Sequence, residues 1–212
     1  MTKVLYLVRH GLTDWNVQRK MQGHSNIPIN EVGREQAKAL QKFFAETHVD
    51  HIFSSDLDRA FQTIEIATEA LLPKREIRKL ASLREVNLGS VEGITQAEIV
   101  EKFGLDSWNQ WTSLAADANF TYPGGETHLQ SRERMLEALK HIFTEFEFQT
   151  AVACTHGLLI RRIAHHLKPE MTEPIEIPNC GVFKLQWQNQ KITFEGLVFA
   201  PDVGEFTFNA KP

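Results

Sequence analysis

The chain has 212 residues, a net charge of −4 and 42% hydrophobic residues, which suits one large α/β domain or a domain with an insertion. The acidic balance argues against a nucleic-acid partner, and no apolar run approaches the ~20 residues of a membrane helix. The N-terminus shows no signal peptide, and two cysteines cannot form a disulfide framework. We therefore expect a cytoplasmic protein without a membrane partner.

The first predicted element is a buried strand that ends at an Arg-His pair. The apolar run Leu5–Val8 stops at Arg9 and His10, and Gly11 then allows a sharp turn. Ligands of open α/β sheets bind at the carboxyl ends of the strands. This strand end is therefore a candidate binding site.

Strands and helices alternate along most of the remaining chain. Asn30 is an expected N-cap, and helices are predicted from there to about residue 44, then at 55–72, 126–146 and 158–167. Strands are predicted at 49–54, 76–83 and 151–154, followed by a hairpin of 181–187 and 191–199. The alternation predicts an α/β layer fold. The hairpin could pair with a second copy, which would give a homodimer.

Residues 94–126 are less regular, with one short predicted helix at Gln96–Phe103. The stretch is too short to bury a core of its own. We interpret it as a cap-like insertion over the sheet edge in a single domain spanning 1–212. The insertion holds four aromatic residues, Trp108, Trp111, Phe120 and Tyr122. We expect them to pack the insertion on the sheet. The alternative is that they form a lid that selects the leaving group.

Three segments resemble the histidine phosphatase superfamily, the phosphoglycerate-mutase-like proteins. Arg9-His10-Gly11, followed by Thr13, Trp15 and Asn16, resembles the signature of the branch that holds broad-specificity phosphatases and cofactor-dependent mutases. Residues 54–60 with Thr63, and Thr155-His156-Gly157, resemble later family segments in the same order. The resemblance implies a three-layer αβα fold with a mostly parallel central sheet, and a phosphoryl-transfer enzyme.

Phosphoryl transfer needs a nucleophile, cations around the phosphate oxygens and a proton donor. His10 is the expected nucleophile, because one nitrogen of a neutral imidazole can attack phosphorus while the other holds the proton. Nearby arginine charges should depress its pKa. Arg9 and Arg59 are the expected phosphate clamps, since guanidinium binds phosphate in a bidentate way.

The resemblance assigns supporting roles to further residues. It implies that His156 binds phosphate without attacking it, and the amide of Gly157, at a predicted helix start, could point at the same anion. Asn16 matches the family residue that donates to the phosphate. The remaining substrate-binding candidates are loop residues, namely Gln22 and Gly23 at the entrance and Thr13 near the substrate.

Glu85 is the expected general acid, which protonates the leaving oxygen and then activates water. Glu92 is its rival, but the segment 83–93 resembles the phosphatase-branch pattern in which the first glutamate is the acid. Mutases carry an Arg-His-Tyr-Gly type of segment after the acid, whereas Val86-Asn87-Leu88-Gly89 follows here. A phosphatase for small phosphate monoesters is therefore favoured. A bisphosphoglycerate-dependent mutase and an inactive phospho-ligand-binding protein are the alternatives.

No metal and no other cofactor is expected, and a small phosphorylated molecule is the expected partner. His165 and His166 are adjacent, so they are expected to face different sides of a helix and to make a poor ligand pair. These two histidines and His128 are interpreted as solvated helix residues. Cys154 ends an apolar strand, as a buried inert cysteine would.

Overall fold

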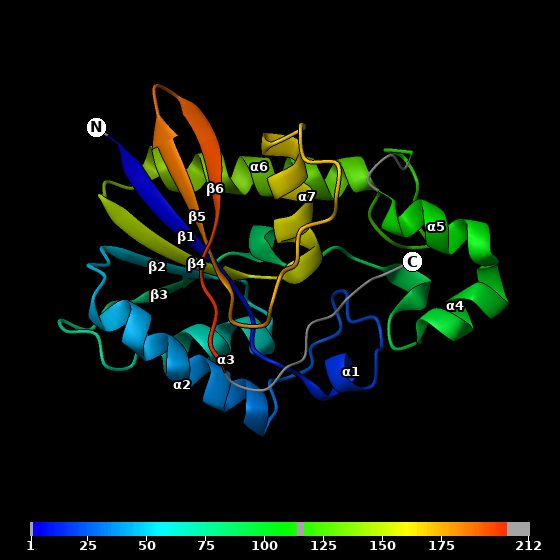
Figure 1. The fold of residues 1–212 in the computed structure, drawn as a ribbon, viewed down its shortest axis with the longest axis horizontal. Coiled ribbons are helices and arrows are strands. Elements are labelled where there is room, and N and C mark those ends of the chain that lie inside the picture. Colours follow the sequence, from blue (N-terminus) through cyan, green and yellow to red (C-terminus); the bar gives the residue numbers. More distant parts are fainter. Residues whose placement is uncertain (1, 114–116, 203–212) are drawn as a thin grey trace.

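The computed structural model describes residues 2–113 and 117–202, which form an α/β fold around one sheet. The described strands lie in the order β3-β2-β4-β1-β5-β6; the first four are parallel to one another, and β5 is antiparallel to both of its neighbours, β1 and β6 (Figure 1). Their bounds are β1 (Lys3–Arg9), β2 (His51–Ser54), β3 (Ile77–Lys79), β4 (Thr150–Thr155), β5 (Val182–Gln188) and β6 (Lys191–Phe199). The predicted α/β class and the hairpin of the last two strands are confirmed.

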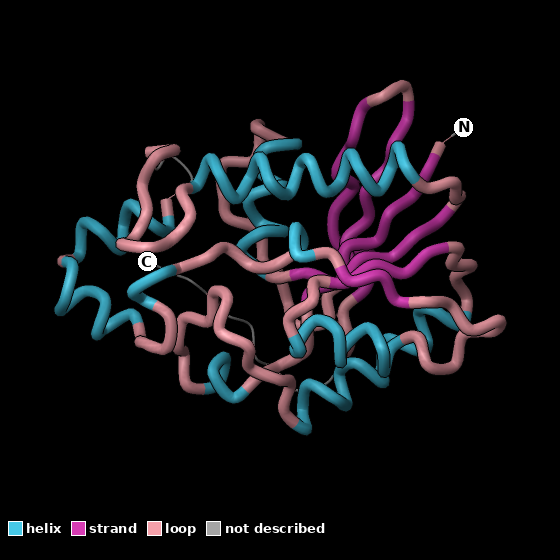
Figure 2. The backbone as a smooth tube through the Cα atoms, turned by 180° about the vertical axis from the view of Figure 1, so that it is seen from behind, coloured by secondary structure: helices cyan, strands magenta, loops and turns pink. Residues whose placement is uncertain are grey.

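Helices cover both faces of the sheet, which confirms the three-layer arrangement (Figures 1 and 2). On one face lie α2 (Glu31–Ala45) and α3 (Asp58–Ala67), and on the other α6 (His128–Glu145) and α7 (Gly157–Leu167). Side chains alternate along a strand, so Leu5 and Leu7 of β1 belong to the core under α6 and α7, while Val8 belongs to the core under α2 and α3. One strand thereby supports both layers.

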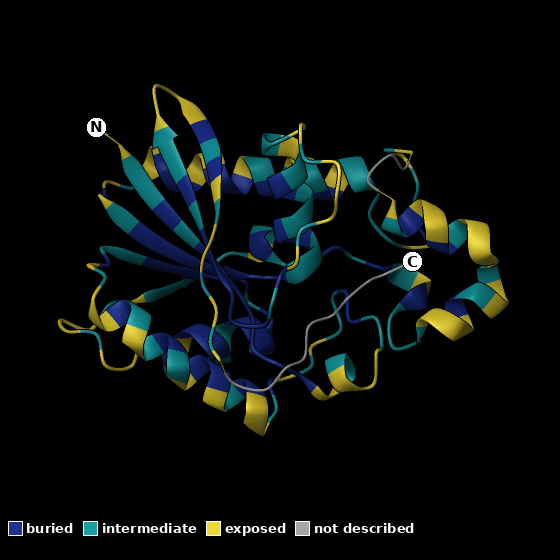
Figure 3. Cartoon of the chain, viewed as in Figure 1, coloured by how far each residue is buried: buried dark blue, intermediate teal, exposed yellow. Residues whose placement is uncertain are grey.

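The sheet brings the two predicted His-Gly segments to one edge. Strands β1 and β4 are parallel neighbours, with Arg9 opposite Thr155. His10 and His156 follow these residues, and their ring centroids lie 5.2 Å apart. The carboxyl ends of the central strands are deeply buried (Figure 3). The candidate site therefore lies where the sequence predicts it, at the carboxyl ends of parallel strands.

Two helices of the 94–126 region extend beyond the sheet (Figure 1). They are α4 (Gln96–Phe103), which has its predicted bounds, and α5 (Leu105–Thr112), which was not predicted. Gly104 separates the two helices at a φ of +84°, a conformation that glycine adopts easily. Trp108, Trp111 and Tyr122 are buried in the main core, as the packing interpretation expects, and residues 114–116 of the region lie outside the described residues.

Several predicted elements are shorter or more exposed than expected. Strand β3 has only three residues because a 3₁₀ turn, Ala81–Leu83, follows it, and α3 ends well before residue 72. Val32, in the first turn of α2, is 39% exposed although its side chain is apolar. The segment after His10 contains the one-turn helix α1 (Asp14–Val17), which was not predicted. Among the described residues, no helix is long and apolar enough to span a membrane.

Candidate active site

His10 is held in one tautomer at the end of β1. Its Nδ1 lies 2.8 Å from the carbonyl oxygen of Gly11. A carbonyl oxygen can only accept, so Nδ1 carries the proton and Nε2 keeps its lone pair. Burial, followed by the charges of Arg59 and Arg9, lowers the pKa of His10 well below its usual value. The ring is therefore neutral at pH 7, with an unprotonated nitrogen available for attack.

Arg59, in the first turn of α3, is fully buried and tied to the loop of residues 23–25. Its Nη2 donates to the carbonyl of Gly23 at 2.6 Å, and its Nη1 donates to that of Ser25 at 2.7 Å. Gly23 has a φ of +51°, and a Cβ there would lie 2.1 Å from Glu92, so this turn requires glycine. The predicted entrance residue Gly23 thereby also positions the guanidinium.

Arg9, the last residue of β1, is the second buried cation whose charge acts on His10. Its Nη1 donates to the carbonyl of Ile177, while its buried Nε has no hydrogen-bond partner among the described residues. A Cβ at Gly157 would lie 3.0 Å from that Nε, so the glycine permits the close approach. Burial lowers the pKa of both Arg9 and Arg59 to about 10, which leaves them charged at neutral pH. Two buried cations thus act on the His10 ring.

His156 lies behind Arg59. Its Nδ1 accepts from Arg59 Nε at 3.2 Å, which places the proton of the neutral ring on Nε2, 2.9 Å from Ser55 Oγ. The residue is fully buried and is not among the described pocket-lining residues. In this arrangement His156 orients Arg59. The direct phosphate contact expected from the resemblance would require its Nε2 to leave Ser55.

Thr13 and Asn16 form a capping box at α1. Asn16 Oδ1 accepts from the Thr13 amide at 3.2 Å and from Thr13 Oγ1 at 3.1 Å. This fixes the side-chain amide so that Nδ2 is the remaining donor, and Asn16 lines the pocket. Gln22 also lines it, with a buried Oε1 that lacks a partner among the described residues. Thr13 is fully buried and is not a described lining residue, so it positions Asn16 rather than substrate.

Glu85 and Glu92 have different environments. Glu85 lines the pocket, and its carboxylate accepts from the amides of Leu158 at 3.2 Å and Leu159 at 3.1 Å in the first turn of α7. Both oxygens of Glu92 are bonded to residues 24 and 25, which braces the entrance loop. Glu92 is not among the described lining residues. The geometry supports the preference for Glu85 as the proton donor.

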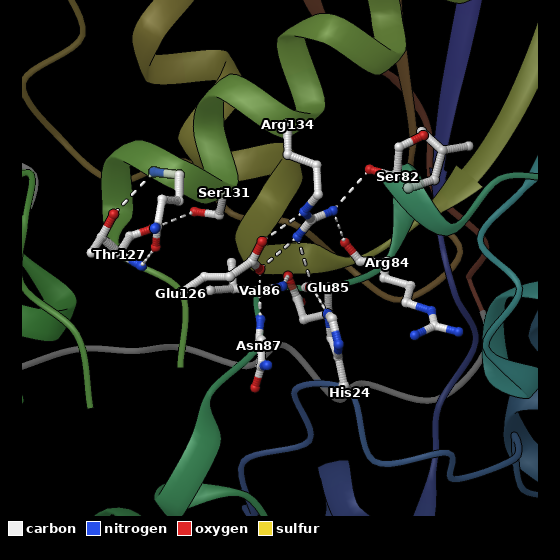
Figure 4. A network of polar contacts seen from close by, with 12 residues as sticks. His24, Ser82, Arg84, Glu85, Val86, Asn87, Glu126, Thr127, Ser131 and Arg134 are labelled. Atoms are coloured by element: carbon white, nitrogen blue, oxygen red, sulfur yellow. Dashed lines mark hydrogen bonds and ion pairs between the residues drawn. The ribbon is translucent and has the colours of Figure 1, made fainter. Parts of the chain in front are cut away.

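An ion pair fixes the backbone that carries Glu85 (Figure 4). Arg134 of α6 makes two 2.8 Å bonds to the Glu126 carboxylate. It also donates to the carbonyls of Ser82, Arg84 and Glu85 at 2.8, 2.9 and 3.1 Å. His24 Nε2 lies 2.8 Å from the same Glu85 carbonyl. The sequence does not reveal this network, because nothing in the spacing of residues 126 and 134 links them to a loop so distant in sequence.

The candidate site opens into a pocket of about 420 Å³. Trp108 and Trp111 line it as well as the core, so they pack as expected, and the lid interpretation stays a prediction. His128, His165 and His166 also line it; His166 is exposed, as expected of a solvated helix residue, whereas His128 and His165 are half-buried. Successive residues of a helix lie ~100° apart, so neighbours can share one face. Among the described residues, no group of three His, Cys, Asp or Glu could hold a metal ion.

One pocket is lined by a neutral imidazole, two buried arginines and a carboxylate, a set of groups suited to phosphoryl transfer. The model of the histidine phosphatase superfamily (branch 1) matches residues 5–199, and the chain belongs to this superfamily.

Known proteins of two kinds resemble the chain. Phosphoglycerate mutase-like protein 4 of Arabidopsis thaliana is 32% identical over 179 residues, which cover 84% of this chain and 76% of that protein. A metal-independent phosphoserine phosphatase of the same plant is 32% identical over 161 residues, 75% of this chain and 66% of that protein. The solved structure of Bacillus stearothermophilus YhfR has a TM-score of 0.81 and 28% identity, covering 92% of this chain and 96% of that one. The family therefore supports a phosphatase or mutase activity.

Proposed function

We propose that this protein is a metal-independent phosphatase that hydrolyses small phosphate monoesters through a phosphohistidine at His10. The observation that carries the proposal is the fixed tautomer of His10 in a pocket that Arg9 and Arg59 also line. A neutral Nε2 is nucleophilic, and two guanidinium groups supply the positive charge that phosphoryl transfer requires.

The reaction has two steps. In the first, His10 Nε2 forms a bond to phosphorus, the ester P–O bond breaks, and Glu85 in its acid form gives its proton to the leaving oxygen. Arg9, Arg59 and Asn16 Nδ2 hold the remaining phosphate oxygens. In the second, Glu85 takes a proton from water, water oxygen bonds to phosphorus, and the P–N bond breaks. Inorganic phosphate leaves and His10 regains its lone pair.

Mutase activity is the alternative, and the naming of an Arabidopsis relative as phosphoglycerate mutase-like favours it. The segment after Glu85 favours hydrolysis, because it lacks the pattern of the mutase branch. Asn87 of this segment donates its amide to Glu126 at 2.8 Å and bonds to Gly89, so its contacts hold the loop itself. The phosphoserine phosphatase among the relatives supports the same preference.

The test is phosphate release from 4-nitrophenyl phosphate, 3-phosphoglycerate, a sugar bisphosphate and a nucleoside phosphate in EDTA, with isomerisation of 3-phosphoglycerate followed in parallel. We expect release without isomerisation. His10→Ala should abolish turnover, while His48→Ala, which changes an exposed histidine, should not. Isomerisation that depends on bisphosphoglycerate would establish mutase activity. No detectable activity on any ester would favour an inactive phospho-ligand-binding protein.

A further inference from the structure

Helix α7 carries one apolar face and one pocket face. Leu159, Ile160 and Ile163 are buried in the core. The pocket face repeats at one-turn spacing and consists of Gly157, Leu158, Arg161, Arg162, His165 and His166. Its first turn contacts the Glu85 carboxylate. Residue 162 lies about 6 Å further along the axis than residue 158. The helix thus leads from the proton donor into a second part of the pocket.

The pocket as a whole is strongly cationic. Besides Arg9 and Arg59, the described lining residues include Lys20, Arg132, Arg161 and Arg162, whereas Glu85 is their one carboxylate. Like charges gathered around a partly desolvated pocket repel each other and attract anions. The charge exceeds what a single phosphate ester requires.

Arg162 has the geometry of a built anion site. Its Nη1 donates to Ser131 Oγ at 2.5 Å, and its guanidinium carbon lies 4.6 Å from the centre of the Trp111 ring. These contacts fix the plane of the group. Its Nε and Nη2 are buried and have no hydrogen-bond partner among the described residues. This edge of a guanidinium binds both oxygens of a carboxylate or phosphate.

The surroundings of Arg162 support the same conclusion. The ring of His128 lies 5.1 Å from that of Trp111, and His128 Nε2 is likewise buried without a partner among the described residues. Burial, then the charge of Arg162, lowers the pKa of His128 to about 4, so this ring is neutral at pH 7. Burial also lowers the pKa of Arg162 to about 10, and it stays charged. Unpaired buried donors are costly unless a ligand satisfies them.

We propose that Arg162, held by Ser131 and Trp111, binds a second acidic group on the organic part of the substrate. The preferred substrates are then small phosphate esters that also carry a carboxylate or a second phosphate. This inference rests on the proposed function, because it places the ester phosphate at His10. The second group lies one helical turn beyond Glu85, at the far part of the same pocket.

The experiment compares matched pairs of esters that differ in one acidic group. 3-Phosphoglycerate is compared with glycerol 1-phosphate for the carboxylate, and propanediol bisphosphate with propanediol monophosphate for the second phosphate. We expect kcat/KM of the wild type to favour the diacid of at least one pair by tenfold or more. Arg162→Met should lower that ratio at least tenfold, which corresponds to about 1.4 kcal/mol. Arg34→Met, on the exposed face of α2, should leave the ratio unchanged.

The outcomes separate this inference from the proposed function. Hydrolysis of 4-nitrophenyl phosphate by the wild type, with diacid ratios near one, would overturn the inference alone. An unchanged ratio in folded Arg162→Met would overturn it too. An enzyme inactive on every ester would contradict the proposed function, and calorimetric binding of the same pairs would then test Arg162. Should Arg162→Met fail to fold by circular dichroism, Ser131→Ala, which releases the guanidinium, should lower the ratio instead.

Discussion

Replacing Arg134 by methionine should both destabilise the protein and misplace the proton donor. The change removes five hydrogen bonds, two to Glu126 and three to the carbonyls of residues 82, 84 and 85. Methionine keeps a comparable apolar stem but cannot donate a hydrogen bond. Glu126 would keep its bond from the Asn87 amide and lose its counter-charge.

The magnitude follows from the burial of the pair. Breaking a fully buried ion pair typically costs 3–5 kcal/mol. The two side chains here are 22% and 21% exposed, so solvent compensates in part and we expect about 2–3 kcal/mol. For a chain of this size that corresponds to a fall in Tm of about 4–12 °C. Arg34→Met is the matched control, because its 3.8 Å pair with Glu31 is exposed and should be worth less than about 0.5 kcal/mol.

The assay compares an alkyl with an aryl phosphate. A shift of the Glu85 backbone by about 1 Å can reduce a rate by about 100-fold. An alkoxide leaving group needs protonation more than a nitrophenolate does. Arg134→Met should therefore lower kcat/KM for the alkyl ester by about 10- to 100-fold, and that for 4-nitrophenyl phosphate clearly less. A lowered Tm with equal losses for both esters would refute the claim that this ion pair positions the acid.

Four further predictions can be measured on the same protein. Glu85→Gln should slow hydrolysis of alkyl phosphates more than of aryl phosphates, and an equal loss would count against Glu85 as the acid. Activity should survive EDTA, and inhibition that added metal reverses would disprove the metal-independent route. The pKa of His128 is lowered to about 4, so between pH 6.5 and pH 4 the unfolded state binds more protons than the folded state. The free energy of unfolding measured in urea should therefore fall from pH 6.5 towards pH 4, and it should fall less steeply in His128→Asn. Burial raises the pKa of the Cys154 and Cys180 thiols, so iodoacetamide should leave the native enzyme active, and rapid inactivation with alkylation of either would contradict their burial.

The fold could be predicted where pattern and local chemistry agree. The apolar run before Arg9 and the alternation of helices and strands are short-range signals, and the Asn30 cap is confirmed by its 3.0 Å bond from the Gly33 amide. The segment at 76–83 was predicted as a longer strand because its side chains suit one. The structure ends the strand at Lys79, since Arg134 and its partners hold the following turn. Contacts of this kind form only in the packed tertiary structure, so the local sequence pattern could not predict them.

In the candidate site, too, residues in local motifs could be predicted, whereas residues that depend on tertiary contacts could not. His10, Arg9 and Arg59 carry local motifs, and the sheet brings them together. The capping box of Thr13 with Asn16 could not be predicted from the motif, because it depends on the turn that the chain makes after His10. Arg162 escaped notice because its importance depends on Trp111 and Ser131, which lie on two other helices. The one-turn spacing after Leu158 is the signal that could have identified it.

The central claim is the phosphohistidine at His10, and trapping it is the most direct test. Turnover of a phosphate ester is quenched in alkali within milliseconds, and the protein is digested and mapped by mass spectrometry. The account predicts an acid-labile phosphoryl group on His10 Nε2 that forms and disappears at rates compatible with turnover, and that is absent from His10→Ala. Turnover with no phosphoryl group on His10, or with one on another residue, would contradict it.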